Sequence, residues 1–392
     1  MALQRKCTLR TNYDEAIACY DKALEVDPEN YSILYNKGLV LYESGEYDEA
    51  RSCFEKIIKD NPPHRDAMHY LANIFYAQTK YDEAIACYDK ALEVGPENPD
   101  IEYNKGLALY ASGRYNEALT CFDKSMASNP EDPQILHYIA LSYQALGEYN
   151  WAIAYYDKII RIRPDETTAV NDKGLALSAL AKHDEAIACY DRILEVDPKN
   201  IDALINKGLA LSALAKHDEA IACYDKALEV DPNYVYGWYN KAISLDSLHN
   251  YDKAIACYDK VLELDPDDVE ALHAASLNGK AWILANIGKN QIALNLIEIS
   301  LRLNPKSPNA LDTKAFILYN LRRYKESLKY CDLSIELDPT DAEYRQRKGM
   351  ILLRLASNRD GKAHFTKKEK FQSAIFDNAK TLQDNDNSEA LT

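Results

Sequence analysis

A proline recurs at a fixed interval through most of this chain. The series runs Pro28, Pro62, Pro96, Pro130, Pro164, Pro198, Pro232 and Pro266, and after one longer step it resumes at Pro305 and Pro339. The stretch that carries the period is YDEAIACYDKALEVDP at residues 13–28, which returns almost unchanged at residues 81–96. A fixed period of about 34 residues is typical of a solenoid, in which each repeat is one supersecondary unit.

Each repeat is expected to form two helices. In the first copy, apolar residues three or four apart make one stripe of a helix, namely Tyr13, Ala16, Ile17, Tyr20, Ala23 and Leu24. Pro28 should end this helix, because proline has no N–H to donate and disfavours helical geometry in the residue before it. A partner helix spans residues 32–44, and Gly45 follows it where a left-handed residue is typical. Glycine returns at the same phase as Gly113, Gly147 and Gly288. The unit is therefore two antiparallel helices of about 12 to 14 residues each.

Small and aromatic residues occupy fixed positions of the repeat. If the late proline is numbered position 32, position 8 is glycine or alanine, and position 20 is alanine in nine copies and serine at Ser327. Position 24 holds Tyr20, Phe54, Tyr88, Phe122, Tyr156, Tyr190, Tyr224 and Tyr258. Small residues let two helices approach closely, and a large ring fills the space between them. In period, residue type and phase the unit resembles the tetratricopeptide repeat (TPR). The resemblance implies an all-α fold, a right-handed superhelical solenoid of antiparallel helix pairs, with about ten 34-residue units plus an N-terminal half unit.

The phase of the repeat divides the chain. Residues 1–30 supply the second helix of a partial repeat, and residues 1–10 are either a frayed partial helix or a sign that the chain is a fragment of a longer protein. Seven regular units then occupy 31–268, a helix-compatible insertion 269–273, two divergent units 274–341, a degenerate and interrupted capping unit 342–382, and a polar tail 383–392. The stretch 345–370 is locally basic. It is interpreted as a solvated loop and cap face, with a patch for an acidic partner as the alternative.

The charge balance favours a protein partner. The formal net charge is −16 and the sequence pI is about 5.0. Binding to nucleic acid depends largely on Lys and Arg at phosphates, so a nucleic-acid partner is not expected, and an anionic membrane surface is disfavoured for the same reason. No segment approaches 18 continuous apolar residues, so no membrane span is expected. A neutral or basic protein partner fits this charge.

Seven of the nine cysteines share one position of the repeat, one residue before the aromatic. They are Cys19, Cys53, Cys87, Cys121, Cys189, Cys223 and Cys257. We interpret them as small buried packing residues, and free thiols of this kind suit a reducing cytoplasm. The alternative is a metal or disulfide ladder. It is disfavoured because the chain has no C-x-x-C pair, and stacked repeats should hold equivalent residues further apart than the roughly 7 Å a disulfide allows.

Catalytic motifs are absent from the sequence. There is no P-loop, no G-x-G-x-x-G after a strand, no G-x-S-x-G and no H-E-x-x-H. Acid pairs such as Asp14-Glu15 recur with the repeat, and they are explained by the preference of carboxylates for the first turn of a helix. We therefore expect no enzymatic activity, no cofactor and no metal.

The TPR resemblance also implies a binding surface. In that family the first helices line a concave groove through positions 2, 5, 6, 9, 12 and 13, and extended or helical peptides bind there. Carried over to this sequence, the groove residues are Tyr35, Asn36, Leu39, Tyr42, His69, Asn73, Tyr76, Tyr103, Asn104, Leu107, Tyr110, Asn206, Tyr239, Asn240, Trp282 and Tyr319. The alternative is that these rings pack against the neighbouring repeat instead.

Two subtypes of the family can be compared with this surface. A carboxylate clamp needs lysine at position 5, but the lysines here lie two positions later, at position 7. They are Lys37, Lys105, Lys173, Lys207, Lys241, Lys280, Lys314 and Lys348, and a rotation of about 100° per residue takes them out of the clamp. A ladder of asparagines at position 6 is matched only in part, by Asn36, Asn104, Asn206 and Asn240.

The sequence therefore predicts a non-enzymatic scaffold. It would bind a peptide or helix of a partner protein in a concave groove lined by Tyr, Leu and Asn. One alternative is a self-assembling structural solenoid that associates through exposed terminal repeats. Another is a regulatory or substrate-recruiting arm of a larger enzyme.

Overall fold

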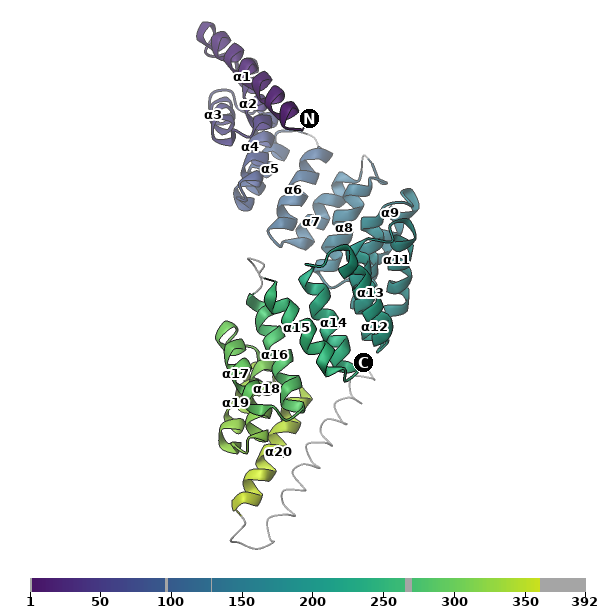
Figure 1. Ribbon diagram of the computed structural model, residues 1–392. Helices are drawn as coiled ribbons and strands as arrows, with labels where there is room; N and C mark the ends of the chain where they lie inside the picture. The colour runs from purple at the N-terminus through teal and green to yellow at the C-terminus, as the bar shows by residue number, and fades with distance from the viewer. Residues whose placement is uncertain (1, 96–97, 128, 265–269, 360–392) are drawn as a thin grey trace, which may run out of the picture. The chain divides into compact units, whose positions relative to one another are not determined.

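The described chain is built of helices alone. The computed structural model describes residues 2–95, 98–127, 129–264 and 270–359, which form twenty α-helices and contain no strand. They fall into two compact units, Met1–Val196 and Asp197–Thr392. Within each unit successive helices pack against each other in order along the chain (Figure 1). The all-α solenoid predicted from the repeat is confirmed.

The first unit contains α1 to α11. Their bounds are α1 (Ala2–Val26), α2 (Tyr31–Ser44), α3 (Tyr47–Asp60), α4 (Arg65–Ala77), α5 (Tyr81–Glu93), α6 (Pro99–Ala111), α7 (Tyr115–Ser125), α8 (Pro133–Ala145), α9 (Tyr149–Ile162), α10 (Thr167–Ala179) and α11 (His183–Val196). From α2 onward, each even-numbered helix is the first helix of a repeat and the odd-numbered helix after it is the second.

The second unit contains α12 to α20. Their bounds are α12 (Ile201–Ala213), α13 (His217–Val230), α14 (Val235–Ser247), α15 (Tyr251–Glu263), α16 (Glu270–Asn286), α17 (Asn290–Leu303), α18 (Pro308–Asn320), α19 (Tyr324–Leu337) and α20 (Ala342–Arg359). None of the helices that the structure describes is both long and apolar enough to cross a membrane.

The even-numbered helices form an inner layer in each unit. In the first unit α2 is in contact with α4, α4 with α6, and α6 with α8. In the second unit the same holds for α12 with α14, α14 with α16, α16 with α18, and α18 with α20. Odd-numbered helices of successive repeats make at most marginal contact among the described residues. Helices that are closer together on one side make that side concave, so the inner layer is the concave one.

Local sequence sets where the inner helices begin and end. Asn30 caps α2, because its side-chain oxygen accepts a hydrogen bond from the backbone N–H of Ile33 at 3.2 Å. Gly45 ends the same helix in the left-handed region, with φ of +87°. The other glycines predicted at this phase, Gly113, Gly147 and Gly288, also have positive φ. Most first helices thus stop after three to four turns, and the chain reverses into the second helix.

Close approach of the two helices in a repeat depends on positions 8 and 24. A Cβ atom placed on Gly106 would lie 2.6 Å from Cε1 of Phe122, whose side chain is fully buried. The same pairing joins Gly38 to Phe54 and Gly174 to Tyr190. This confirms the prediction that a small residue at position 8 faces a ring at position 24 and that the ring fills the space between the helices.

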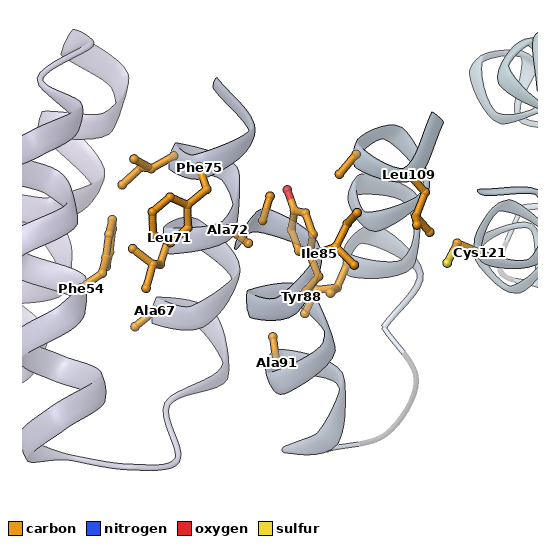
Figure 2. Packing of buried hydrophobic residues seen from close by; sticks show 14 of the residues in the cluster. Phe54, Ala67, Leu71, Ala72, Phe75, Ile85, Tyr88, Ala91, Leu109 and Cys121 are labelled. Atoms are coloured by element: carbon orange, nitrogen blue, oxygen red, sulfur yellow. The ribbon is translucent and has the colours of Figure 1, made fainter. Parts of the chain in front are cut away.

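The rings at position 24 also join one repeat to the next. Figure 2 shows Phe54 of α3 facing Ala67 and Leu71 of α4, which belongs to the following repeat. Tyr88 of α5 lies between α4 and α6 in the same view. Both rings are fully buried. One ring per repeat therefore packs between the two helices of its own repeat and also against the first helix of the next repeat.

An ion pair follows the same repeat geometry. The lysine at position 7 pairs with the acid at position 25 of the preceding repeat, which lies on an odd-numbered helix. The pairs are Lys37–Asp21, Lys105–Asp89, Lys173–Asp157, Lys241–Asp225, Lys280–Asp259, Lys314–Glu298 and Lys348–Asp332. These ammonium groups are therefore held at the helix interface between repeats.

Three segments differ from the regular repeat. Residues 2–26 form one continuous helix, because the sequence before Tyr13 contains no glycine or proline to interrupt it. In the second unit α16 begins at Glu270 and has 17 residues, whereas α14 and α18 have 13. The last helix, α20, continues to Arg359. The remainder of the predicted capping unit, 360–382, and the predicted polar tail at 383–392 lie outside the described residues.

Burial of the cysteines is less uniform than the repeat predicts. Cys53, Cys121, Cys223 and Cys257 are buried, and Cys87 and Cys189 are half-buried. Cys19 is exposed, so the prediction of a buried packing residue is wrong there. The reason is that α1 is packed against α2 only, within the part of the chain that the structure describes.

The contact between positions 8 and 24 can be tested at Gly106. The substitution Gly106→Ala should lower the free energy of unfolding by about 1 to 3 kcal/mol, because the added methyl overlaps the buried Phe122 ring. The control is Gly349→Ala in α20, where none of the described residues lies within 4 Å of the added Cβ. That change should stabilise the helix by up to about 1 kcal/mol. Denaturant unfolding followed by circular dichroism measures both, and equal effects would contradict the packing described here.

Candidate functional site on the inner helices

All sixteen predicted groove residues lie on even-numbered helices. Asn36 is exposed and the other fifteen are half-buried. Eleven of them are in the first unit, on α2, α4 and α6, and five are in the second, on α12, α14, α16 and α18. None is withdrawn into the core, so each could present part of its side chain to a ligand. Their contacts divide them into groups of different chemistry.

One group is an aromatic cluster between α2 and α4. Tyr70 stacks on Phe54 with ring centroids 5.7 Å apart and an interplanar angle of 18°. Tyr35 and Tyr42 meet Tyr70 edge-on at 6.0 and 5.7 Å. The same arrangement recurs two repeats later on α6 and α8, where Tyr138 stacks on Phe122 and meets Tyr103 and Tyr110. The predicted tyrosines therefore pack on the next repeat and stay partly exposed.

A polar group lies between the two aromatic clusters. The Tyr88 hydroxyl donates a hydrogen bond to Oδ1 of Asn73 at 2.5 Å. The Asn104 amide nitrogen is 2.8 Å from Nε2 of His69, so it donates to that ring nitrogen. Two predicted groove residues, Asn73 and Asn104, are thus already engaged inside the protein. Their remaining polar atoms are the ones left for a ligand.

The polar arrangement also recurs after two repeats. His137 Nε2 lies 3.5 Å from Oδ2 of Asp172, and Tyr156 donates to Oε1 of Gln144 at 3.1 Å. The first unit therefore alternates two kinds of interface, each of which returns after two repeats. In one kind, a phenylalanine at position 24 lies beneath a tyrosine of the next repeat. In the other kind, position 24 is a tyrosine, and a histidine and an amide or acid lie beside it. Sequence reasoning missed the part played by Tyr70, Tyr138, His137 and Asp172. The signal that could have found them is the alternation of Tyr and His at position 5, in step with Phe and Tyr at position 24.

A hollow of about 370 Å³ opens on this surface of the first unit. Its walls include Tyr103, His137, Tyr138 and Leu141, with further residues from α9 and α10. Aromatic and polar groups converge there in a mostly preformed arrangement, which is typical of a binding site. Of the predicted residues, only Tyr103 lines it.

Burial sets the protonation states of the inner face. Burial first, and the neighbouring Tyr70 phenol second, raise the pKa of Tyr35 to about 12. Burial and the Tyr138 phenol raise the pKa of Tyr103 to about 12 in the same way. Burial lowers the pKa of His69, which favours the neutral imidazole. At neutral pH the surface therefore offers neutral phenols and a neutral imidazole as hydrogen-bonding groups.

In the second unit, Trp282 lies under a cation from the protein itself. The rings of Trp282 and Phe316 are 4.9 Å apart. The guanidinium of Arg347 lies 5.5 Å from the Trp282 ring centroid and 4.9 Å from that of Phe316. Arg347 Nε also pairs with Oδ1 of Asp312 at 2.5 Å, and the two side chains are 12% and 8% exposed. The interpretation of Arg347 as part of a solvated cap face is wrong, because two rings and a buried carboxylate hold it in the inner layer.

The other predicted residues of the second unit are less tightly connected. Tyr239 meets the Tyr258 ring at 6.1 Å. The Tyr319 hydroxyl accepts a hydrogen bond from Arg354 Nε at 3.1 Å. Asn206 and Asn240 are half-buried on α12 and α14. The second unit thus presents a more interrupted surface than the first.

Helix pairs stacked with a 34-residue period define this chain as an α-solenoid repeat protein. It belongs to the tetratricopeptide repeat proteins. TPR family models match residues 72–113, 201–234, 235–268 and 308–341. A model described as anaphase-promoting complex, cyclosome, subunit 3 matches residues 10–91 and 111–193.

Solved structures show the same fold at low sequence identity. The APC/C hetero-tetramer Cut9-Hcn1 is similar with a TM-score of 0.53 and 16% identity, over 87% of this chain and 73% of that one. A tetratricopeptide repeat protein from Parabacteroides merdae gives 0.50 and 17%, over 69% and 98%. The C-terminal part of a TPR repeat-containing protein from Cytophaga hutchinsonii gives 0.51 and 16%, over 63% and 98%. A search of curated proteins found no match to this chain.

The neutral state of His69 predicts a pH dependence. Because the folded state disfavours the imidazolium, the unfolded chain takes up the proton more readily as the pH falls below the ordinary histidine pKa of about 6.5. His69 should therefore contribute a loss of stability below that pH and none above it. Protonation of His69 would also turn Nε2 from an acceptor into a donor, and it would then face the Asn104 amide N–H, which is a donor too.

Denaturant midpoints at pH 7.5 and 5.5 measure this effect. The comparison is between the unsubstituted chain and His69→Gln, since other groups also titrate. The unsubstituted chain should lose more stability between the two pH values. An equal loss in both proteins would show that His69 does not titrate differently on folding.

The Arg347–Asp312 ion pair predicts that removing one partner costs more stability than removing both. Arg347→Met should destabilise the chain by about 3 kcal/mol, because it leaves the Asp312 carboxylate buried without its cation. The double substitution Arg347→Met with Asp312→Leu should cost less than Arg347→Met alone. Urea unfolding of the three proteins supplies the comparison. A double variant that is no more stable than Arg347→Met would show that the loss does not come from the unpaired Asp312 carboxylate.

Proposed function

We propose that this chain is a non-enzymatic scaffold that binds a peptide or helix of a partner protein along the inner face of its first unit. The TPR fold is in general a fold of protein–protein interaction. The observation that carries the finer proposal is the row of half-buried tyrosines on α2, α4 and α6, each held by other rings yet partly exposed. Aromatic residues of this kind are common anchors of protein interfaces.

The inner-face tyrosine rings are already held in place by neighbouring rings before a ligand binds, and this favours binding. Tyr42 is in contact with both Tyr47 and Tyr70, and Tyr110 is in contact with both Tyr115 and Tyr138. Side chains that already sit in one arrangement lose little conformational entropy when a ligand arrives. The exposed ring faces would accept apolar or aromatic side chains of the partner.

The polar group between the aromatic clusters would orient the bound segment. His69, Asn73 and Asn104 sit between the Tyr70 and Tyr138 clusters, and each amide keeps hydrogen-bonding capacity beyond its internal bond. Such groups can pair with the backbone of an extended peptide. We propose that apolar anchors of the partner fall on the two aromatic clusters and that its backbone meets the amides between them.

The double substitution Tyr76→Ala with Tyr110→Ala tests the groove. Peptides selected from a displayed library on the immobilised full chain would be measured against both proteins by calorimetry. The affinity should fall by at least tenfold, since truncation of aromatic anchors commonly costs about 2 kcal/mol. Thermal melts would check that the variant remains folded.

The matched control is Glu49→Ala with Glu83→Ala, which alters exposed residues on α3 and α5. It should leave the affinity unchanged. If the selected peptides bind all three proteins equally, the groove is assigned to the wrong face. If only the control variant loses binding, the odd-numbered helices carry the site.

A further inference from the structure

Three positions of the repeat at residues 133–166 depart from the other copies. Position 11 is leucine or phenylalanine elsewhere but Tyr143 here. Position 19 is glutamate in most copies but Trp151 here, and position 23 is cysteine in seven copies but Tyr155 here. A single departure would mean little. These three come from α8 and α9 and meet in space.

The three rings form one stack. Tyr143 lies between the others, 6.1 Å from Trp151 at an interplanar angle of 27° and 5.7 Å from Tyr155 at 22°. Trp151 is 57% exposed, which is unusual for so large an apolar side chain. Two of the rings belong to the odd-numbered helix α9, so the stack is separate from the inner-layer tyrosines.

A carboxylate without its usual cation lies within electrostatic reach of Tyr143 and Tyr155. Asp123 occupies position 25, where the acid of seven other copies pairs with a lysine at position 7 of the next repeat. In the repeat that follows Asp123, position 7 is Ile139, which is fully buried. Among the described residues no ion pair forms at Asp123, although it lies at the surface.

The rings and this carboxylate influence one another. Burial first, and the Asp123 charge second, raise the pKa of the Tyr143 phenol. Burial, the Tyr143 phenol and then Asp123 raise the pKa of Tyr155. Partial desolvation raises the pKa of the Asp123 carboxyl itself. A carboxylate that has lost part of its hydration next to aromatic faces is an environment that a cation would stabilise.

Another repeat of the same chain shows which cation fits. In the repeat at 308–341, position 23 is Tyr330, position 7 is Lys314, and the preceding acid is Glu298. Lys314 Nζ lies 4.3 Å from the Tyr330 ring centroid and 3.5 Å from Glu298 Oε1. The acid and the ring thus hold a lysine ammonium between them. At residues 123–155 the acid and the ring are both present, but Ile139 stands in place of the lysine at position 7.

We propose that Asp123, Tyr143, Trp151 and Tyr155 form a docking site for a lysine side chain presented by a partner polypeptide. Trp151 is exposed, and Tyr143 and Tyr155 are half-buried, so the site is shallow. A lysine carried by a polypeptide, with neighbouring contacts of its own, therefore fits better than a free small cation. The chain's net charge of −16 favours approach of a basic segment. Lys158, three residues after Tyr155 on α9, already lies over that ring at 4.3 Å, so the ring can accommodate an ammonium group.

The test follows the Trp151 indole N–H resonance of the full chain by NMR, assigned with Trp151→Phe. The probes are the blocked peptides Gly-Gly-Lys-Gly-Gly and Gly-Gly-norleucine-Gly-Gly at equal ionic strength. The lysine peptide should give a saturable shift with a dissociation constant on the order of 10 mM, as a few weak contacts allow. The norleucine peptide should give a shift at least about fivefold weaker.

Two variants examine the roles of Asp123 and the missing lysine. Asp123→Asn keeps the shape of the side chain and removes its charge, and it should weaken lysine-peptide binding about fivefold. Ile139→Lys restores the residue found in other copies and should abolish binding by filling the site from within. Lys158→Gln removes an internal competitor and should tighten binding. The matched control is Glu229→Gln, which removes the charge of an exposed acid on α13 and should leave binding unchanged.

The outcomes decide the proposal. Equal binding of the lysine and norleucine peptides would show an apolar patch only, and unchanged binding in Asp123→Asn would show that the carboxylate has no part. Either result overturns the site, as does an equal shift of the Trp238 and Trp282 indoles. Should Ile139→Lys fail to fold, the Asp123→Asn comparison still gives the answer.

Discussion

The contact between position 8 and position 24 is the one on which the other contacts of the repeat depend. A residue with little or no side chain lets the two helices of a repeat come close enough for one ring to fill the space, as Gly106 and Phe122 show. The same ring, fully buried, then supports the first helix of the next repeat. Because each repeat is in contact mainly with its neighbours, the same local contact is repeated from one helix pair to the next within each unit.

The choice of ring also decides the chemistry of the inner face. Where the ring is phenylalanine, as at Phe54, a tyrosine of the next repeat stacks on it and the surface is aromatic. Where it is tyrosine, as at Tyr88, the buried hydroxyl requires an acceptor, and Asn73 provides it from the inner helix. Packing inside the solenoid therefore determines whether the surface above it is apolar or polar.

Places where the repeat is broken concentrate unbalanced charge. Arg347 replaces the residues usual at position 6 and is held by Asp312 and two rings. Asp123 keeps the usual acid, but Ile139 replaces its lysine. The first break is satisfied within the chain, and the second leaves a carboxylate beside three rings. A periodic scaffold makes such departures informative, because most of the other copies show what the unmodified position does.

The sequence alone determined the period, the paired helices, the small and aromatic positions and the placement of the sixteen groove residues on the first helices. Those features depend on spacing within a single repeat, which sets the face of a helix on which a residue lies. Tertiary structure decided that Tyr70 joins the Tyr35 cluster, that Asn104 is bonded to His69, and that Arg347 is paired with the buried Asp312. These contacts join residues of different repeats and depend on how neighbouring repeats are placed, and the spacing within one helix does not specify that placement.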